Sequence, residues 1–76
     1  MCGIIGIASN KLVASNIIQS LKKLEYRGYD SAGIATIVNG EINEKKCAGR
    51  VDNLEKMLFK NPSNGSLGIG HVRWAT

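Results

Sequence analysis

The chain has 76 residues, with ten Lys and Arg against six Asp and Glu, which gives a formal net charge of +4. Its hydrophobic fraction of 43% and charged fraction of 21% are typical of a globular domain and exclude collagen-like, low-complexity and disordered chains. No apolar run approaches the roughly 20 residues of a membrane helix, and the N-terminus does not resemble a secretion signal. We therefore expect a cytoplasmic protein with no membrane partner. The lysines come in pairs without interleaved aromatic residues, so no nucleic-acid partner is indicated.

The first half of the chain predicts a strand and then a helix. Residues 2–8 form a short apolar run rich in isoleucine, which favours a buried strand, and its two glycines suggest close approach by another segment. Ser9-Asn10 is a plausible helix start. Apolar residues then recur at helical spacing as far as Leu24, which predicts an amphipathic helix of about four turns. A loop over residues 27–31 is expected to follow.

The second half predicts a hairpin, a helix and a final strand. Asn39-Gly40 is a strong hairpin signal, because both positions tolerate the positive φ of a type I′ turn. The hairpin strands are expected at residues 32–38 and 41–47. A helix at residues 51–58, with Asp52 as candidate N-cap, a loop at 61–66 and a strand at 67–74 complete the chain. The resulting β-α-β-β-α-β order, taken alone, indicates a ferredoxin-like module.

Cys2 is the first candidate for chemistry. If Met1 is removed, the Cys2 thiol lies beside a free α-amine, whose pKa of roughly 7.7–8.0 suits a general base. Nucleophile and base would then belong to one residue, as in enzymes with an N-terminal threonine nucleophile. A small buried residue at the start of a strand is the alternative, and position alone leaves both open.

The remaining polar candidates are less specific. Arg73 offers a planar guanidinium that suits a carboxylate, although an ion pair on a surface strand would explain it equally well. His71, Cys2 and Cys47 lack the spacing of a metal site, and no phosphate-binding glycine motif occurs, so no metal or cofactor is predicted. A Cys2–Cys47 disulfide is not expected in a reducing cytoplasm.

Three blocks of sequence carry a resemblance to a known family. They read Met-Cys-Gly-Ile-Ile-Gly at 1–6, Leu-Glu-Tyr-Arg-Gly-Tyr-Asp-Ser-Ala-Gly at 24–33 and Gly-His-Val-Arg-Trp-Ala-Thr at 70–76. In order and spacing they resemble the class II glutamine amidotransferases, and most closely the branch that forms a hexosamine phosphate. Amidophosphoribosyltransferases and asparagine synthetases are the alternatives within the class. A short non-catalytic module that binds glutamine or a partner, or a structural module with Cys2 in its core, is the alternative outside it.

The resemblance implies a fold other than the one the pattern favours. Members of the family are α+β proteins with a four-layer αββα sandwich of the N-terminal-nucleophile type, and residues 1–76 would be the first part of this glutaminase domain. The activity implied is hydrolysis of L-glutamine and transfer of the ammonia to fructose 6-phosphate, which yields glucosamine 6-phosphate and glutamate. The rest of the glutaminase domain and the sugar-phosphate domain would follow residue 76, in a homo-oligomeric enzyme. These 76 residues alone are expected to be inactive.

The resemblance also implies a role for each candidate residue. Cys2 would attack the side-chain amide of glutamine, with its own α-amine as base. Arg73, helped by Thr76, would bind the α-carboxylate of the substrate. Trp74 would help to close the site and keep water from the ammonia. Arg27 would lie near the mature N-terminus and order it, whereas the oxyanion donors and the anchor for the substrate's α-amine would follow residue 76.

Overall fold

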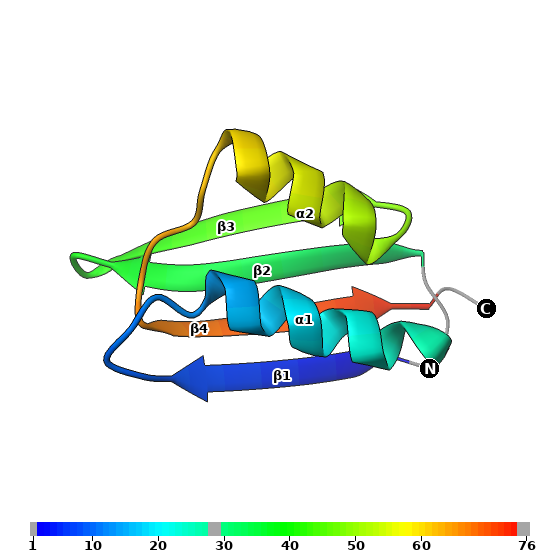
Figure 1. The fold of residues 1–76 in the computed structure, drawn as a ribbon, viewed down its shortest axis with the longest axis horizontal. Helices are drawn as coiled ribbons and strands as arrows, with labels where there is room; N and C mark the ends of the chain where they lie inside the picture. Colours follow the sequence, from blue (N-terminus) through cyan, green and yellow to red (C-terminus); the bar gives the residue numbers. More distant parts are fainter. Residues whose placement is uncertain (1, 28–29, 75–76) are drawn as a thin grey trace.

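The computed structural model describes residues 2–27 and 30–74, without the side chain of Arg27, and confirms the predicted order of elements (Figure 1). The first half contains β1 (Gly3–Ala8), α1 (Ala14–Leu24) and a short 3-10 helix, η1 (Glu25–Arg27). The second half contains β2 (Ser31–Val38), β3 (Glu41–Ala48), α2 (Val51–Lys60) and β4 (Leu67–Arg73). Among the described residues, no helix is both long and apolar enough to cross a membrane.

The four strands form one antiparallel sheet in the order β1-β4-β2-β3. β1 and β2 are therefore parallel to each other with β4 between them, and β3 and β4 are parallel with β2 between them. Each helix thus makes a split β-α-β connection. The central strands are β4 and β2, whereas a ferredoxin-like module has its first and third strands in the centre, so the ferredoxin-like expectation is wrong in its strand order. Both helices cover the same face of the sheet, with α1 over β1 and β4 and α2 over β2 and β3 (Figure 1). This two-layer α+β arrangement is compatible with one half of a sandwich.

The core lies between the two helices and the sheet. The apolar positions that recur along α1 and α2 point into it, so the amphipathic pattern is confirmed. Val72 and Ile34 contribute from the central strands. The fully or nearly fully buried hydrophobic residues are Val13, Ile17, Ile18, Leu21, Ala32, Ile34, Val51, Leu54 and Val72.

α1 packs directly against the backbone of β4, and two glycines of that strand permit the close approach. A Cβ atom at Gly70 would clash with Ile17 and lie 3.1 Å from Leu21 Cδ1. A Cβ atom at Gly68 would lie 2.9 Å from Ala35 O and Thr36 Cγ2 of the neighbouring strand β2, and 3.1 Å from Ile17 Cδ1. Gly70 therefore permits the close packing of α1, and Gly68 permits close packing against both β2 and α1.

The two glycines of β1 differ from each other. A Cβ atom at Gly3 would lie 3.0 Å from Leu24 Cδ1, so the close approach expected from the sequence is confirmed there. At Gly6 the nearest atom would be Ile69 Cγ2, at 3.7 Å, which is an ordinary contact. The expectation is therefore wrong for Gly6, because this residue faces the side of the sheet that carries no helix.

The hairpin is confirmed and the first helix start is corrected. Asn39 and Gly40 have φ values of 53° and 78°, as a type I′ turn requires. α1 begins at Ala14 rather than at Ser9-Asn10. The backbone N–H groups of Ser9 and Val13 instead donate to the carbonyl groups of residues 66 and 65, so the segment before α1 follows the loop that leads into β4.

The second helix start is also corrected. Asp52 is not the N-cap of α2, because the helix begins at Val51 and the N-cap position is Arg50. Asp52 lies in the first turn, where its charge favours the helix dipole. The last strand ends at Arg73, one residue before the predicted end at Trp74.

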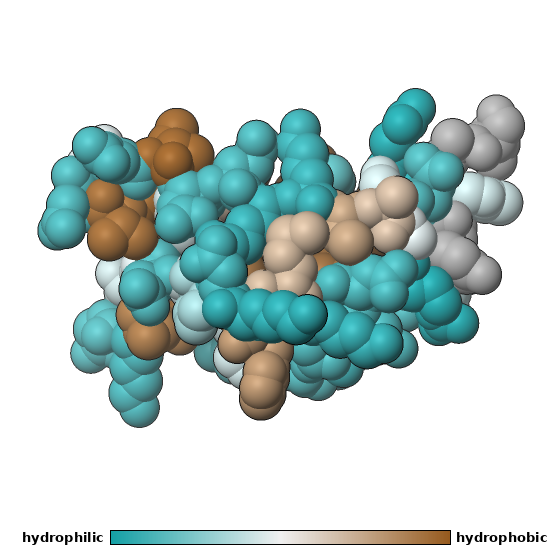
Figure 2. All heavy atoms as spheres, turned by 90° about the horizontal axis from the view of Figure 1, so that it is seen from above, coloured by the Kyte–Doolittle hydropathy of each residue, from teal (hydrophilic) through white to brown (hydrophobic). Residues whose placement is uncertain are grey.

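The other face of the sheet is apolar and open in this chain. Near the β2–β3 hairpin this face forms a hollow of about 270 Å³ lined almost entirely by apolar atoms of residues 35–37, 42 and 67–69. Figure 2 shows hydrophobic side chains gathered over the β2–β3 hairpin, at the left of the view. The exposed large hydrophobic residues on this face are Ile4, Ile37, Ile42, Leu67 and Ile69.

Candidate active site

The three motif blocks meet at one end of the sheet. Gly3 pairs with Val72, so the next residues outward on these neighbouring strands are Cys2 and Arg73. On its other side Arg73 pairs with Ser31, the first residue of β2. Figure 1 shows the start of β1, the start of β2 and the end of β4 together at this end. Antiparallel pairing thus brings together residues that are about 40 and 70 positions apart in the sequence.

Cys2 is an exposed free thiol at this end of the sheet. Cys47 is also free, but it is half-buried against the core on β3, the opposite edge strand. β4 and β2 lie between the edge strands, and three strand spacings separate them by about 14 Å. A disulfide between the two cysteines is excluded at this separation, because their Cα atoms would have to lie within about 7 Å.

Arg73 forms an ion pair with Asp30, the residue before β2. Its Nη1 atom lies 3.7 Å from Asp30 Oδ2, and the two side chains are 63% and 45% exposed. An exposed pair at this distance contributes little to stability. A guanidinium has five N–H donors, so this one contact leaves donors for a second carboxylate. Both sequence-based interpretations of Arg73, a surface ion pair and a carboxylate site, are compatible with this geometry.

The structure describes some of the other predicted site residues and not others. Trp74 directly follows β4 and is 44% exposed, beside Arg73. Thr76 and Met1 lie outside the described residues, as does the side chain of Arg27, so their roles remain predictions. His71 is on the open face, where its ring covers Gly33. Within residues 2–27 and 30–74, no three His, Cys, Asp or Glu side chains gather as a metal site.

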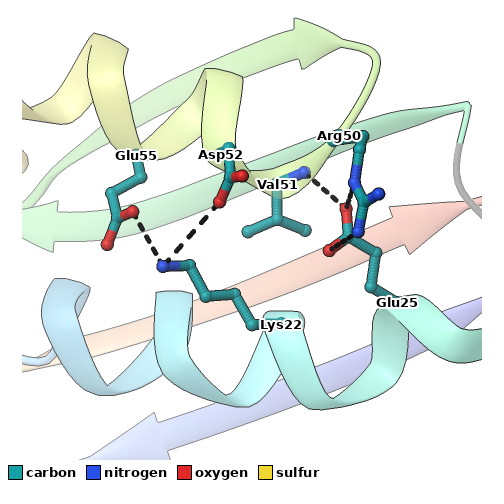
Figure 3. Close-up of polar contacts among 6 residues, drawn as sticks. All are labelled: Lys22, Glu25, Arg50, Val51, Asp52 and Glu55. Atoms are coloured by element: carbon teal, nitrogen blue, oxygen red, sulfur yellow. Dashed lines mark hydrogen bonds and ion pairs between the residues drawn. The ribbon is translucent and has the colours of Figure 1, made fainter.

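Sequence reasoning gave Glu25 no role of its own beyond its place in the second motif block. The Glu25 side chain is only 9% exposed. Its Oε2 atom accepts hydrogen bonds from the Val51 backbone N–H at 2.9 Å and from Arg50 Nε at 3.3 Å, and Arg50 Nη2 lies 3.2 Å from Oε1 (Figure 3). Burial raises the pKa of this carboxyl, but the hydrogen bonds from Arg50 and Val51 outweigh burial and lower the pKa below 4.5.

A second ionic contact joins α1 to α2. Lys22 Nζ of α1 lies 2.8 Å from Glu55 Oε1 and 3.8 Å from Asp52 Oδ1 of α2 (Figure 3). The hydrogen bond to Glu55 raises the pKa of Lys22 above 10.5, despite the opposing effect of desolvation. Lys22 of α1 and Glu25 of η1 therefore both contact the first half of α2 and its N-cap residue.

No protein-family model matches the chain. Curated relatives match all 76 residues and carry the name glutamine–fructose-6-phosphate aminotransferase (isomerizing). The relative from Bartonella quintana is 59% identical, that from Brucella abortus 57% and that from Clostridium acetobutylicum 55%. The chain spans 12% of the length of each of these proteins. It matches the N-terminal part of this enzyme.

Proposed function

We propose that the chain is the N-terminal part of a glutamine-hydrolysing domain in an enzyme that transfers the amide nitrogen of glutamine to fructose 6-phosphate. The observation that carries this proposal is the convergence of Cys2 and the Asp30–Arg73 pair at one end of the sheet. The similarity to isomerizing aminotransferases along the whole chain supports fructose 6-phosphate as acceptor over the acceptors of the other class II enzymes. The products would be glucosamine 6-phosphate and glutamate.

Cys2 would act as the nucleophile once Met1 has been removed. Its new α-amine takes the thiol proton, directly or through a water molecule, and the thiolate attacks the side-chain carbonyl carbon of glutamine. The C–N bond of the amide then breaks, and the ammonium group returns the proton to the leaving ammonia. Water hydrolyses the γ-glutamyl thioester, releases glutamate and restores the thiol. The exposure of the thiol suits this role, because a nucleophile must be reached by its substrate.

The neighbouring residues would bind and enclose the substrate. The Arg73 guanidinium would hold the α-carboxylate of glutamine, with Thr76 as a second donor. The partly exposed Trp74 would cover the site and keep water from the ammonia. Arg27 would order the mature N-terminus around Cys2.

The open sheet face supports a sandwich as the complete domain. Isolated soluble domains rarely expose a continuous apolar surface of this kind, and a sheet of one domain is usually covered on its apolar face. We propose that a second sheet, supplied by sequence beyond residue 76, packs on the hollow formed around Ile37, Ile42 and Ile69. Helices α1 and α2 would then form one outer layer of an αββα sandwich.

A pair of cysteine variants tests the nucleophile. In the full-length protein, Cys2→Ala should abolish glutamate release from glutamine, because no thiolate remains to form the thioester. Cys47→Ala is the matched control and should leave the rate within about twofold, because Cys47 is on the opposite edge strand. Intact mass should show that Met1 is removed. Equal loss in both variants would contradict the proposal, as would full activity of Cys2→Ala.

A further inference from the structure

α2 has no capping side chain of its own, and a residue that directly follows the other helix provides the cap. The N-cap residue, Arg50, makes no side-chain cap hydrogen bond. The carboxylate of Glu25 accepts the Val51 N–H instead, and it also holds the Arg50 guanidinium through two N–H groups. A carboxylate at this position satisfies an unpaired helix donor and interacts favourably with the helix dipole. Glu25 therefore fixes the turn between β3 and α2.

The same turn holds the residue that faces Arg73. The Gly49 N–H donates to the carbonyl oxygen of Asp30 at 2.8 Å. Gly49 has a φ of 89°, a conformation that favours glycine, so the chain turns from β3 toward α2 directly after this hydrogen bond. Asp30 in turn places its carboxylate 3.7 Å from the Arg73 guanidinium. A continuous set of contacts thus runs from Glu25 through the turn to Arg73.

We propose that Glu25 is a positioning residue for the glutamine α-carboxylate. It holds the β3–α2 turn, the turn holds Asp30, and Asp30 orients the Arg73 guanidinium toward the substrate. This inference rests on the proposed function, in which Arg73 binds that carboxylate. Paired recognition of a carboxylate by a guanidinium depends on the orientation of the planar group, so a loosened Asp30 weakens substrate binding more than it alters the chemical step.

The test compares two isosteric substitutions in the full-length enzyme. Glu25→Gln keeps an acceptor for the Val51 N–H but removes the charge that holds Arg50. Glu55→Gln is the matched control, because it weakens the 2.8 Å contact of Lys22 in α1 with the same helix α2 without touching the turn. We expect Glu25→Gln to raise the KM for glutamine about three- to tenfold with little change in kcat. Glu55→Gln should leave the KM unchanged, even if it lowers the melting temperature.

Two further variants separate positioning from folding. Arg50→Met should raise the KM as Glu25→Gln does, whereas Arg50→Lys should restore most of the affinity by keeping the positive charge beside Glu25. In an Asp30→Asn background, Glu25→Gln should raise the KM by less than about twofold, because the contact through which it acts is already broken.

The outcomes distinguish this inference from the proposed function. Wild-type enzyme that releases no glutamate from glutamine would overturn the proposed function. Active wild type with the same KM in Glu25→Gln and in Glu55→Gln would overturn only the role of Glu25. A fall in kcat at unchanged KM would also overturn it, because that result indicates a smaller fraction of folded enzyme. If Glu25→Gln does not fold, an equal KM in Arg50→Met and Arg50→Lys overturns the inference in the same way.

Discussion

Substitution of Gly70 by alanine tests how tightly α1 is packed on β4. The new Cβ atom would overlap with Ile17 and lie 3.1 Å from Leu21 Cδ1, and both of these side chains are fully buried. Neither can turn away without displacing the rest of the core, so the helix must move away from the strand. Overpacking of this kind costs about 1–3 kcal/mol. Alanine recovers roughly 0.5–1 kcal/mol through its lower backbone entropy, which leaves a net loss between about 0 and 2.5 kcal/mol, centred on about 1.3 kcal/mol.

Gly6→Ala is the matched control for this prediction. Gly6 is also in a strand, but its Cβ atom would meet only Ile69 Cγ2 at 3.7 Å and a backbone oxygen at 4.0 Å, so no atom has to move. Gly6→Ala should therefore destabilise this part of the protein less than Gly70→Ala, even with the proposed second sheet packed on the same face. The comparison removes the intrinsic difference between alanine and glycine and leaves the packing cost at Gly70.

Hydrogen exchange in the full-length protein gives a local measurement. A loss of about 1.4 kcal/mol should accelerate exchange of the amides of β4 and α1 about tenfold in Gly70→Ala, if they open together. Gly6→Ala should accelerate exchange of these amides less than Gly70→Ala does. Equal rates in the two variants would refute the close packing of α1 on β4, as would a Gly70→Ala protein more stable than wild type.

Two further predictions concern charge and the open face. Because the folded-state pKa of Glu25 is lowered, its stabilising contribution is present above its unfolded pKa near 4.5 and is lost as pH falls through the folded value. Hydrogen-exchange protection of the amides at the start of α2, corrected for intrinsic exchange, should decrease below about pH 4.5 in the wild type. The decrease should be smaller in Glu25→Gln. Identical pH profiles of the two proteins would contradict this prediction. The isolated 76-residue chain should self-associate through its open face on size-exclusion chromatography and release no glutamate from glutamine. A monomeric, active 76-residue chain would contradict both expectations.

The sequence predicted a turn or a helix correctly where its conformation depends on the residues within that segment. Asn39-Gly40 predicted its turn because the required positive φ values depend on those two residues themselves. The helical spacing of Ile17 and Leu21 predicted α1 because a helix repeats its buried face at short range. The start of α1 was predicted wrongly, because Ser9-Asn10 has the residue types of a cap but the segment around it pairs with the loop at residues 65–66.

The candidate site was predicted through its motifs, whereas its supporting contacts were not. Cys2 and Arg73 were chosen for their chemistry and for a resemblance in sequence, and the sheet places them at the same end of neighbouring strands. The role of Glu25 has no local signal, because its partners lie 25 and 26 positions away. Asp30 was noted only as part of a loop, since its ion pair with Arg73 requires β2 and β4 to be neighbours.

By itself, the sequence determined the order of strands and helices, the hairpin turn and the three blocks whose residues carry the proposed chemistry. These properties depend on residue type and short-range spacing, which can be read without knowing the neighbours in space. Only the tertiary structure decided the strand order β1-β4-β2-β3, the cap that Glu25 provides for α2 and the face of the sheet that stays open. These depend on contacts between distant segments, and the periodicity of each segment is the same whichever neighbours it has.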